Sequence, residues 1–136
     1  KQHLKLGPGG LTDVEWTVQL LQLQHAHEVP GLRTPGTLEA LRNAEQAGLL
    51  DPADLELLEN AWMLCGRVRN AIMLWKGRGS DTLPSSARDR DGIGRILGYD
   101  PDHTLQLEDD ILRTMRLARG VVQRVFYGEP SESHRH

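Results

Sequence analysis

The stretch that decides the fold runs from Asp51 to Trp75 and reads DPADLELLENAWMLCGRVRNAIMLW. Apolar residues recur in it at alternating steps of three and four: Leu58, Ala61, Cys65, Val68, Ile72 and Trp75. This spacing lines up one side of an α-helix and predicts a long helix packed in a bundle. Asp51-Pro52 is typical of a helix start and Gly77 of a helix end. As a member of this seam, Trp75 is expected to be buried.

A second seam near the C-terminus predicts a helix over about residues 105–127. Its apolar side comprises Leu107 or Glu108, Ile111, Met115, Ala118, Val122 and Val125. Shorter helices are predicted over residues 13–28, 34–48 and 85–97, with a flexible polar loop over 77–85. No segment alternates polar and apolar residues as a strand would. The predicted fold is therefore an all-α helical bundle of about five helices, two long and the others shorter.

Composition limits the function classes. The 136 residues suit one domain; 38% are hydrophobic and only 4% aromatic, so a helical core of Leu, Val, Ile and Ala is expected. The net charge is −3 without a basic block, which does not fit nucleic-acid binding. No apolar run is long enough to span a membrane. Cys65 is the single cysteine, which excludes an internal disulfide and fits a reducing compartment.

A glycine-rich turn leads into the first predicted helix, in the sequence KLGPGGLTDVEWTVQ over residues 5–19. Thr12 and Glu15 fit a reciprocal capping box, which places the helix start at Asp13. Trp16 belongs to a second apolar side of this helix, which predicts contacts with two neighbours. We expect residues 1–11 to form an interdomain turn, 12–128 the bundle and 129–136 a disordered tail, the chain being one end of a larger protein.

The same segment resembles the K-x-x-x-G-G-x-x-D-[IV]-E-[FW]-x-x-Q signature of bacterial glutamine synthetase adenylyltransferases. The later sequence QHAHEVP, residues 24–30, resembles the motif that follows in the C-terminal half of those enzymes, and VQRVF, residues 122–126, is similar to actinobacterial members. The resemblance implies a cytoplasmic, two-headed enzyme in which each nucleotidyltransferase unit is followed by a helical domain. One unit attaches AMP from ATP to a tyrosine of glutamine synthetase, the other removes it, and a PII-type signal protein and glutamine regulate both. This chain matches the helical domain after the adenylylating unit.

The resemblance places the catalytic core, with its Asp-x-Asp pair for magnesium, before Lys1. ATP and Mg²⁺ are thus expected cofactors of the full-length enzyme and not of this piece, which is expected to be inactive alone. Asp109-Asp110 lacks the Asp-x-Asp spacing, and Asp89 and Asp91 diverge on a helix. His25, His27 and Glu28 lack the four-residue spacing of helical metal ligands, so no metal site is predicted.

Six residues are candidates for supporting the domain junction and the upstream cleft: Lys5, Gly9, Gly10, Asp13, Glu15 and Gln19. The glycines could form a tight turn or bring backbone N–H groups to a phosphate. Asp13 and Glu15 could shape the upstream active site, or they could only stabilise the helix start.

Trp62 lies beside the seam and is the candidate contact for a protein partner. Five arginines are expected on solvated helix flanks with local ion pairs: Arg67, Arg69, Arg113, Arg116 and Arg119. Two other functions stay open. The chain could be a regulatory interaction module that binds a PII-type signal protein, or the helical domain of a PII uridylyltransferase.

Overall fold

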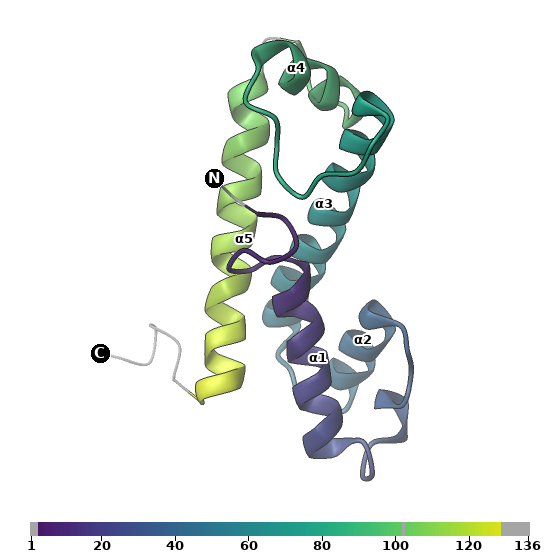
Figure 1. Ribbon diagram of the computed structural model, residues 1–136. Helices are drawn as coiled ribbons and strands as arrows, with labels where there is room; N and C mark the ends of the chain where they lie inside the picture. Colours follow the sequence, from purple (N-terminus) through teal and green to yellow (C-terminus); the bar gives the residue numbers. More distant parts are fainter. Residues whose placement is uncertain (1–2, 102, 129–136) are drawn as a thin grey trace, which may run out of the picture.

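The computed structural model describes residues 3–101 and 103–128 (Figure 1). The elements are α1 (Leu11–His25), the 3₁₀ turn η1 (Pro30–Leu32), α2 (Thr37–Gln46), α3 (Pro52–Lys76), α4 (Ala87–Ile96) and α5 (Thr104–Tyr127). Within these described residues the one β feature is an isolated bridge between His3 and Thr82. The predicted all-α bundle is confirmed. The tail predicted over residues 129–136 lies outside the described part of the chain.

Helices α3 and α5 form the spine of the bundle. They pack against each other in opposite directions, and α4 joins them at one end (Figure 1). Helices α1 and α2 cover the other half of the spine, and the N-terminal segment crosses it near the middle. α1 contacts α3, α5 and α2, so the expectation that this helix has more than one neighbour is met.

The two predicted seams form most of the core. From α3 the buried residues are Leu58, Ala61, Cys65, Val68, Ala71 and Ile72. From α5 they are Leu107, Ile111, Met115, Ala118, Val121 and Val122. The core has two clusters, one around α1 and α2 and the other around Leu4, Leu83 and Ile93. Trp62 is half-buried and packs against both clusters.

Trp75 departs from the seam and is 40% exposed. Its indole lies over Gly92 of α4, where an added Cβ would overlap the ring, and its Nε1–H donates a hydrogen bond to Asp89 Oδ1 at 2.9 Å. The expectation that Trp75 is buried is therefore wrong. The indole N–H needs a hydrogen-bond acceptor, and Asp89 on α4 supplies one at the edge of the core.

The predicted capping box at Thr12 and Glu15 is also wrong. α1 begins at Leu11, after Gly10, and no side chain caps it. The N–H groups of Leu11 and Thr12 instead donate to the carbonyls of Leu4 and Lys5, at 3.0 and 2.9 Å. The N-terminal segment thus satisfies donors that a side chain usually satisfies at a helix start.

Other boundaries follow local chemistry. α1 ends at His25, three residues before the predicted end, and α2 begins at Thr37 after Gly36, three residues after the predicted start. Ser86 caps α4, its Oγ accepting from the Asp89 N–H at 3.0 Å. The 77–85 loop is anchored, since Leu83 is buried and the Leu4 N–H donates to the Asp81 carbonyl at 2.7 Å.

Two glycine substitutions provide opposite tests of this packing. Gly92→Ala places a methyl group into the Trp75 indole and should lower the free energy of unfolding by about 1–3 kcal/mol. Gly66→Ala, in the interior of α3 with no atom within 4 Å of the added Cβ, should raise it by about 0.5–1 kcal/mol. Urea unfolding followed by tryptophan fluorescence measures both. A Gly92→Ala chain as stable as the parent would contradict the α3–α4 contact.

Candidate functional site: the N-terminal turn, α1 and α5

The glycine-rich turn lies directly against α5. Gly9 has φ of +79°, a conformation that other residues rarely adopt, and a Cβ there would overlap the carbonyl of Met115. A Cβ on Gly10 would overlap the carbonyl of Leu4. Both glycines are buried; Gly9 allows the turn to pack closely against α5, and Gly10 allows the turn to pack on itself.

Asp13 joins three parts of the chain at this turn. Its side-chain oxygen Oδ2 accepts from the Gly9 N–H at 2.7 Å and from Arg119 Nη1 at 2.9 Å. Asp13 is only 8% exposed, whereas the Arg119 side chain is half-buried at the edge of α5. A carboxylate with two such donors, one of them charged, makes stronger hydrogen bonds than a neutral acceptor. We call this arrangement of Gly9, Asp13 and Arg119 the clasp.

The arginines are therefore not limited to local ion pairs. Arg119 reaches Asp13, which is 106 residues away in sequence, and Arg69 Nε pairs with Asp81 Oδ1 at 2.6 Å. For these two residues the expectation of local pairing on a solvated face is wrong. The reason is that the fold brings distant carboxylates to the helix edges.

The six predicted junction residues divide into two groups. Gly9, Gly10 and Asp13 are buried and point into the bundle. Lys5 and Gln19 are exposed, and Glu15 is half-exposed on the first turns of α1. The sequence pattern could not separate these groups, because the direction of each side chain depends on where α5 lies.

Large apolar side chains are exposed on the outward side of α1. Trp16 is 54% exposed and Leu23 83% exposed, seven residues apart on one side of the helix, with the half-buried Leu20 between them. Leu6 in the preceding turn is exposed as well. Large exposed apolar side chains gathered on one face are typical of a contact surface. We call Trp16, Leu20 and Leu23 the α1 face.

A groove on α5 adjoins the clasp and was missed by the sequence analysis. It is a hollow of about 520 Å³ lined by Pro8, Leu112, Arg116, Arg119, Gly120 and Gln123. The sequence does contain a signal for this groove. A second set of residues follows helical spacing on α5, outside the buried seam: Leu112, Arg116, Arg119 and Gln123. Arg116 is exposed and forms no ion pair with any residue in the described ranges.

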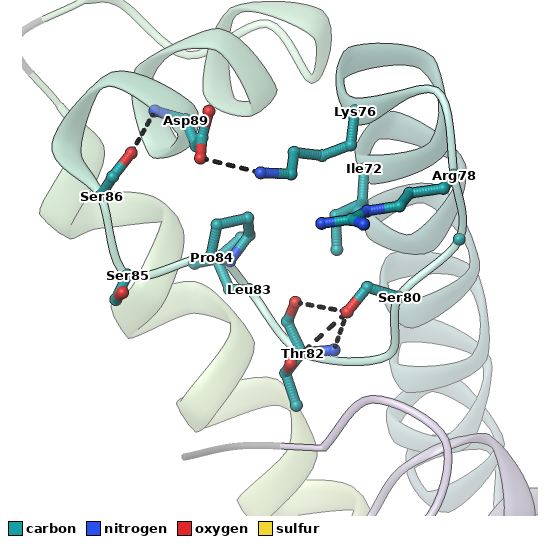
Figure 2. Close-up of a pocket in the computed structure, with 11 residues that line it drawn as sticks. Ile72, Lys76, Arg78, Ser80, Thr82, Leu83, Pro84, Ser85, Ser86 and Asp89 are labelled. Carbon is teal, nitrogen blue, oxygen red and sulfur yellow. Dashed lines mark hydrogen bonds and ion pairs between the residues drawn. The ribbon is translucent and has the colours of Figure 1, made fainter.

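A second hollow, of about 540 Å³, lies between the end of α3, the 77–85 loop and the start of α4 (Figure 2). Figure 2 shows Lys76 and Arg78 reaching into it from the α3 side, with Lys76 Nζ 3.2 Å from Asp89 Oδ2. The Trp75 indole N–H and then Lys76 hold the pKa of Asp89 below its usual range. Asp89 thus stays ionised and offsets the positive charge of Lys76.

Acidic and histidine side chains do not converge on a cation site in the part of the chain that is described. No group of three or more His, Cys, Asp or Glu that could hold a metal ion occurs there. His27 Nε2 lies 3.4 Å from Glu28 Oε1, at the exposed end of α1. None of the helices in these ranges has the length and apolar character needed to cross a membrane.

The family model described as GlnD PII-uridylyltransferase matches residues 1–126. The chain belongs to this family. The match includes the clasp, the α1 face and every residue of the α5 groove.

Three relatives of this chain bear the same name. The chain is 56% identical to the bifunctional glutamine synthetase adenylyltransferase/adenylyl-removing enzyme of Streptomyces avermitilis, over 93% of this chain and 13% of that protein. It is 52% identical to the Streptomyces coelicolor enzyme, over 93% of this chain and 13% of that protein. It is 45% identical to the Mycobacterium avium enzyme, over 91% of this chain and 12% of that protein. The predicted resemblance to actinobacterial adenylyltransferases is confirmed, and the chain spans about an eighth of the length of these relatives.

Asp13→Asn tests the clasp in this family member. The change removes the charge that Arg119 pairs with, and we expect the free energy of unfolding to fall by about 1–3 kcal/mol in urea unfolding. Glu15→Gln, on the outer side of the same helix, is the matched control and should stay within about 0.5 kcal/mol of the parent. Equal stability of the two variants would show that the clasp does not stabilise the fold.

Cys65 offers a test of the core cluster that contains Leu4, Leu83 and Ile93. Burial raises the pKa of its thiol to about 11 from 9.0, an effect that nearby Arg69 only partly opposes. Because the unfolded chain ionises its thiol first, this burial contributes stability below pH 9 that is lost as the pH rises toward 11.

At pH 8 the thiol of Cys65 in the folded chain should react with a disulfide reagent at least about 100-fold more slowly than the same thiol in the urea-unfolded chain. Similar rates in both conditions would contradict the buried position.

Proposed function

We propose that this chain is the helical domain of a glutamine synthetase adenylyltransferase, and that it supports AMP transfer from ATP to a tyrosine of glutamine synthetase. The observation that carries the proposal is the identity of 45–56% to relatives with that printed name, over more than nine-tenths of the chain. Since the match covers only 12–13% of those proteins, the transfer reaction is assigned to another part of the enzyme. The enzyme is proposed to act in the cytoplasm.

The carboxylates of Asp89 and Asp110 do not fit a magnesium site. The Asp89 carboxylate is held by Trp75 and Lys76, and the Asp110 carboxylate accepts from Tyr99 Oη at 2.5 Å and from Gln106 Nε2 at 2.9 Å. Carboxylates with these partners are not available as a convergent pair. We therefore assign Mg²⁺ and ATP to the nucleotidyltransferase unit and derive no step through them here.

The proposed role of the domain is to hold that unit in place. The α1 face would pack against the nucleotidyltransferase domain, with Lys5, Glu15 and Gln19 at the rim of the contact. The clasp fixes α1 and the glycine turn to α5, so a domain docked on α1 would be held rigidly to the spine. Positioning of the reacting groups is a large part of catalysis in group transfer, which makes such support valuable.

Glutamine synthetase and a PII-type signal protein are the proposed external partners. Trp62 is the candidate contact, because it keeps some exposed surface midway along α3 while packing on both core clusters. Aromatic side chains with one packed and one open side are favoured at protein contacts.

The second candidate is the helical domain of a PII uridylyltransferase, which the family description itself supports. The relatives cited above favour the adenylyltransferase, since each bears that name at 45% identity or more. A transfer assay with the full-length enzyme separates the two functions. Transfer of labelled AMP to glutamine synthetase supports the adenylyltransferase, and transfer of labelled UMP to a PII protein supports the uridylyltransferase.

Trp16→Ala in the full-length enzyme tests the docking role. Loss of a central aromatic contact typically costs about 2 kcal/mol, so AMP transfer to glutamine synthetase should fall about 30-fold. Leu74→Ala, at a similarly exposed apolar residue near the end of α3, should keep the parent rate. Unfolding of the excised chain is measured in parallel, and Trp16→Ala should leave it within about 0.5 kcal/mol. A parent-like transfer rate for Trp16→Ala would refute the docking role of the α1 face.

A further inference from the structure

We propose that the α5 groove receives an Asp or Glu side chain from the domain that docks on the α1 face, and that Arg116 is its ion-pair partner. The inference rests on the proposed docking role and adds to it the chemistry of the contact. Its basis is the position of the groove, the charge within it and the character of its walls.

The groove and the α1 face both lie next to the clasp, on α5 and α1 respectively. The clasp joins Asp13 of α1 to Arg119 of α5, and Arg119 also lines the groove. Trp16 follows Asp13 by three residues and Arg116 precedes Arg119 by three, so each lies about one helical turn from the clasp. α1 and α5 run in the same direction along this side of the bundle (Figure 1). One partner can therefore cover both surfaces.

The charge in the groove matches a single carboxylate. Arg119 is already paired with Asp13, which cancels its charge. Arg116 is exposed and lacks an ion-pair partner among the described residues, so it supplies the one net positive charge. Asp109 stands two helical turns from Arg116, about 10 Å along the axis, too far for a direct pair. One unpaired guanidinium in the lining matches the charge of one carboxylate, whereas a dianionic phosphate or a triphosphate would need a second unpaired cation among the residues that line the groove.

The walls of the groove suit a protein segment. Pro8 and Leu112 are exposed and apolar, and Gln123 adds an amide that can donate a hydrogen bond. Gly120 adds no side chain to the groove, and a Cβ built there would make ordinary van der Waals contact with Arg124 Nη1 at 3.7 Å. Protein interfaces are enriched in arginine, and a guanidinium bordered by apolar side chains binds carboxylate in a fixed geometry.

Carbodiimide cross-linking in the full-length enzyme tests the proposal, because this reagent joins a lysine amine directly to a contacting carboxylate. Arg116→Lys places such an amine in the groove. Mass spectrometry should then find a cross-link from position 116 to one Asp or Glu outside this chain, at least 10-fold more abundant than any cross-link that the control Arg88→Lys makes to a residue outside this chain. Arg88 is exposed on α4, at the far tip of the bundle (Figure 1).

Four results would overturn the inference. They are a yield of cross-links outside this chain no higher than that of Arg88→Lys, cross-links only to carboxylates of this chain, a cross-link to glutamine synthetase when that protein is added, and loss of the cross-link in millimolar inorganic phosphate while the domains stay docked. The last result would make the groove an anion site. Failure here is distinguishable from failure of the proposed function. If Trp16→Ala lowers AMP transfer but Arg116→Lys gives no cross-link, docking on the α1 face stands and the acidic contact is rejected.

Discussion

The carboxylate of Asp13 is the interaction on which the functional end of this bundle depends. One oxygen accepts from the Gly9 backbone and from the Arg119 guanidinium, so a single group fixes the turn, the start of α1 and the outer edge of α5. The geometry requires glycine at position 9, because any Cβ would overlap the Met115 carbonyl. A loss of charge at Asp13 would thus affect a loop and two helices together.

The clasp explains how an exposed apolar helix side can be presented without loosening the fold. α1 buries Leu11, Val14, Val18 and Leu21 against the spine, while Trp16 and Leu23 stay in solvent on the opposite side. The N-terminal segment adds Leu4 to the core and satisfies the first N–H groups of α1. The same helix can therefore be anchored on one side and available to a partner on the other.

The two surfaces beside the clasp differ in chemistry. The α1 face offers apolar area, and the α5 groove offers one uncompensated guanidinium among the described residues. Apolar area contributes most of the affinity at a protein contact, whereas charge fixes orientation. The hollow near α4 contrasts with the groove, because Asp89 already offsets the charge of Lys76 there.

The sequence by itself determined the helix count, the two seams and the family. Apolar periodicity is a local property, so it predicted the buried residues of α3 and α5 without knowledge of their partners. The same pattern failed at Trp75, whose indole N–H found an acceptor on another helix, and at Thr12, whose capping role went to the carbonyls of Leu4 and Lys5. Only the tertiary structure decided that Asp13 points inward and pairs with Arg119, and that Arg116 lines a groove together with Arg119. Asp13 and Arg119 are 106 residues apart, and no local pattern encodes a contact between side chains that far apart in sequence.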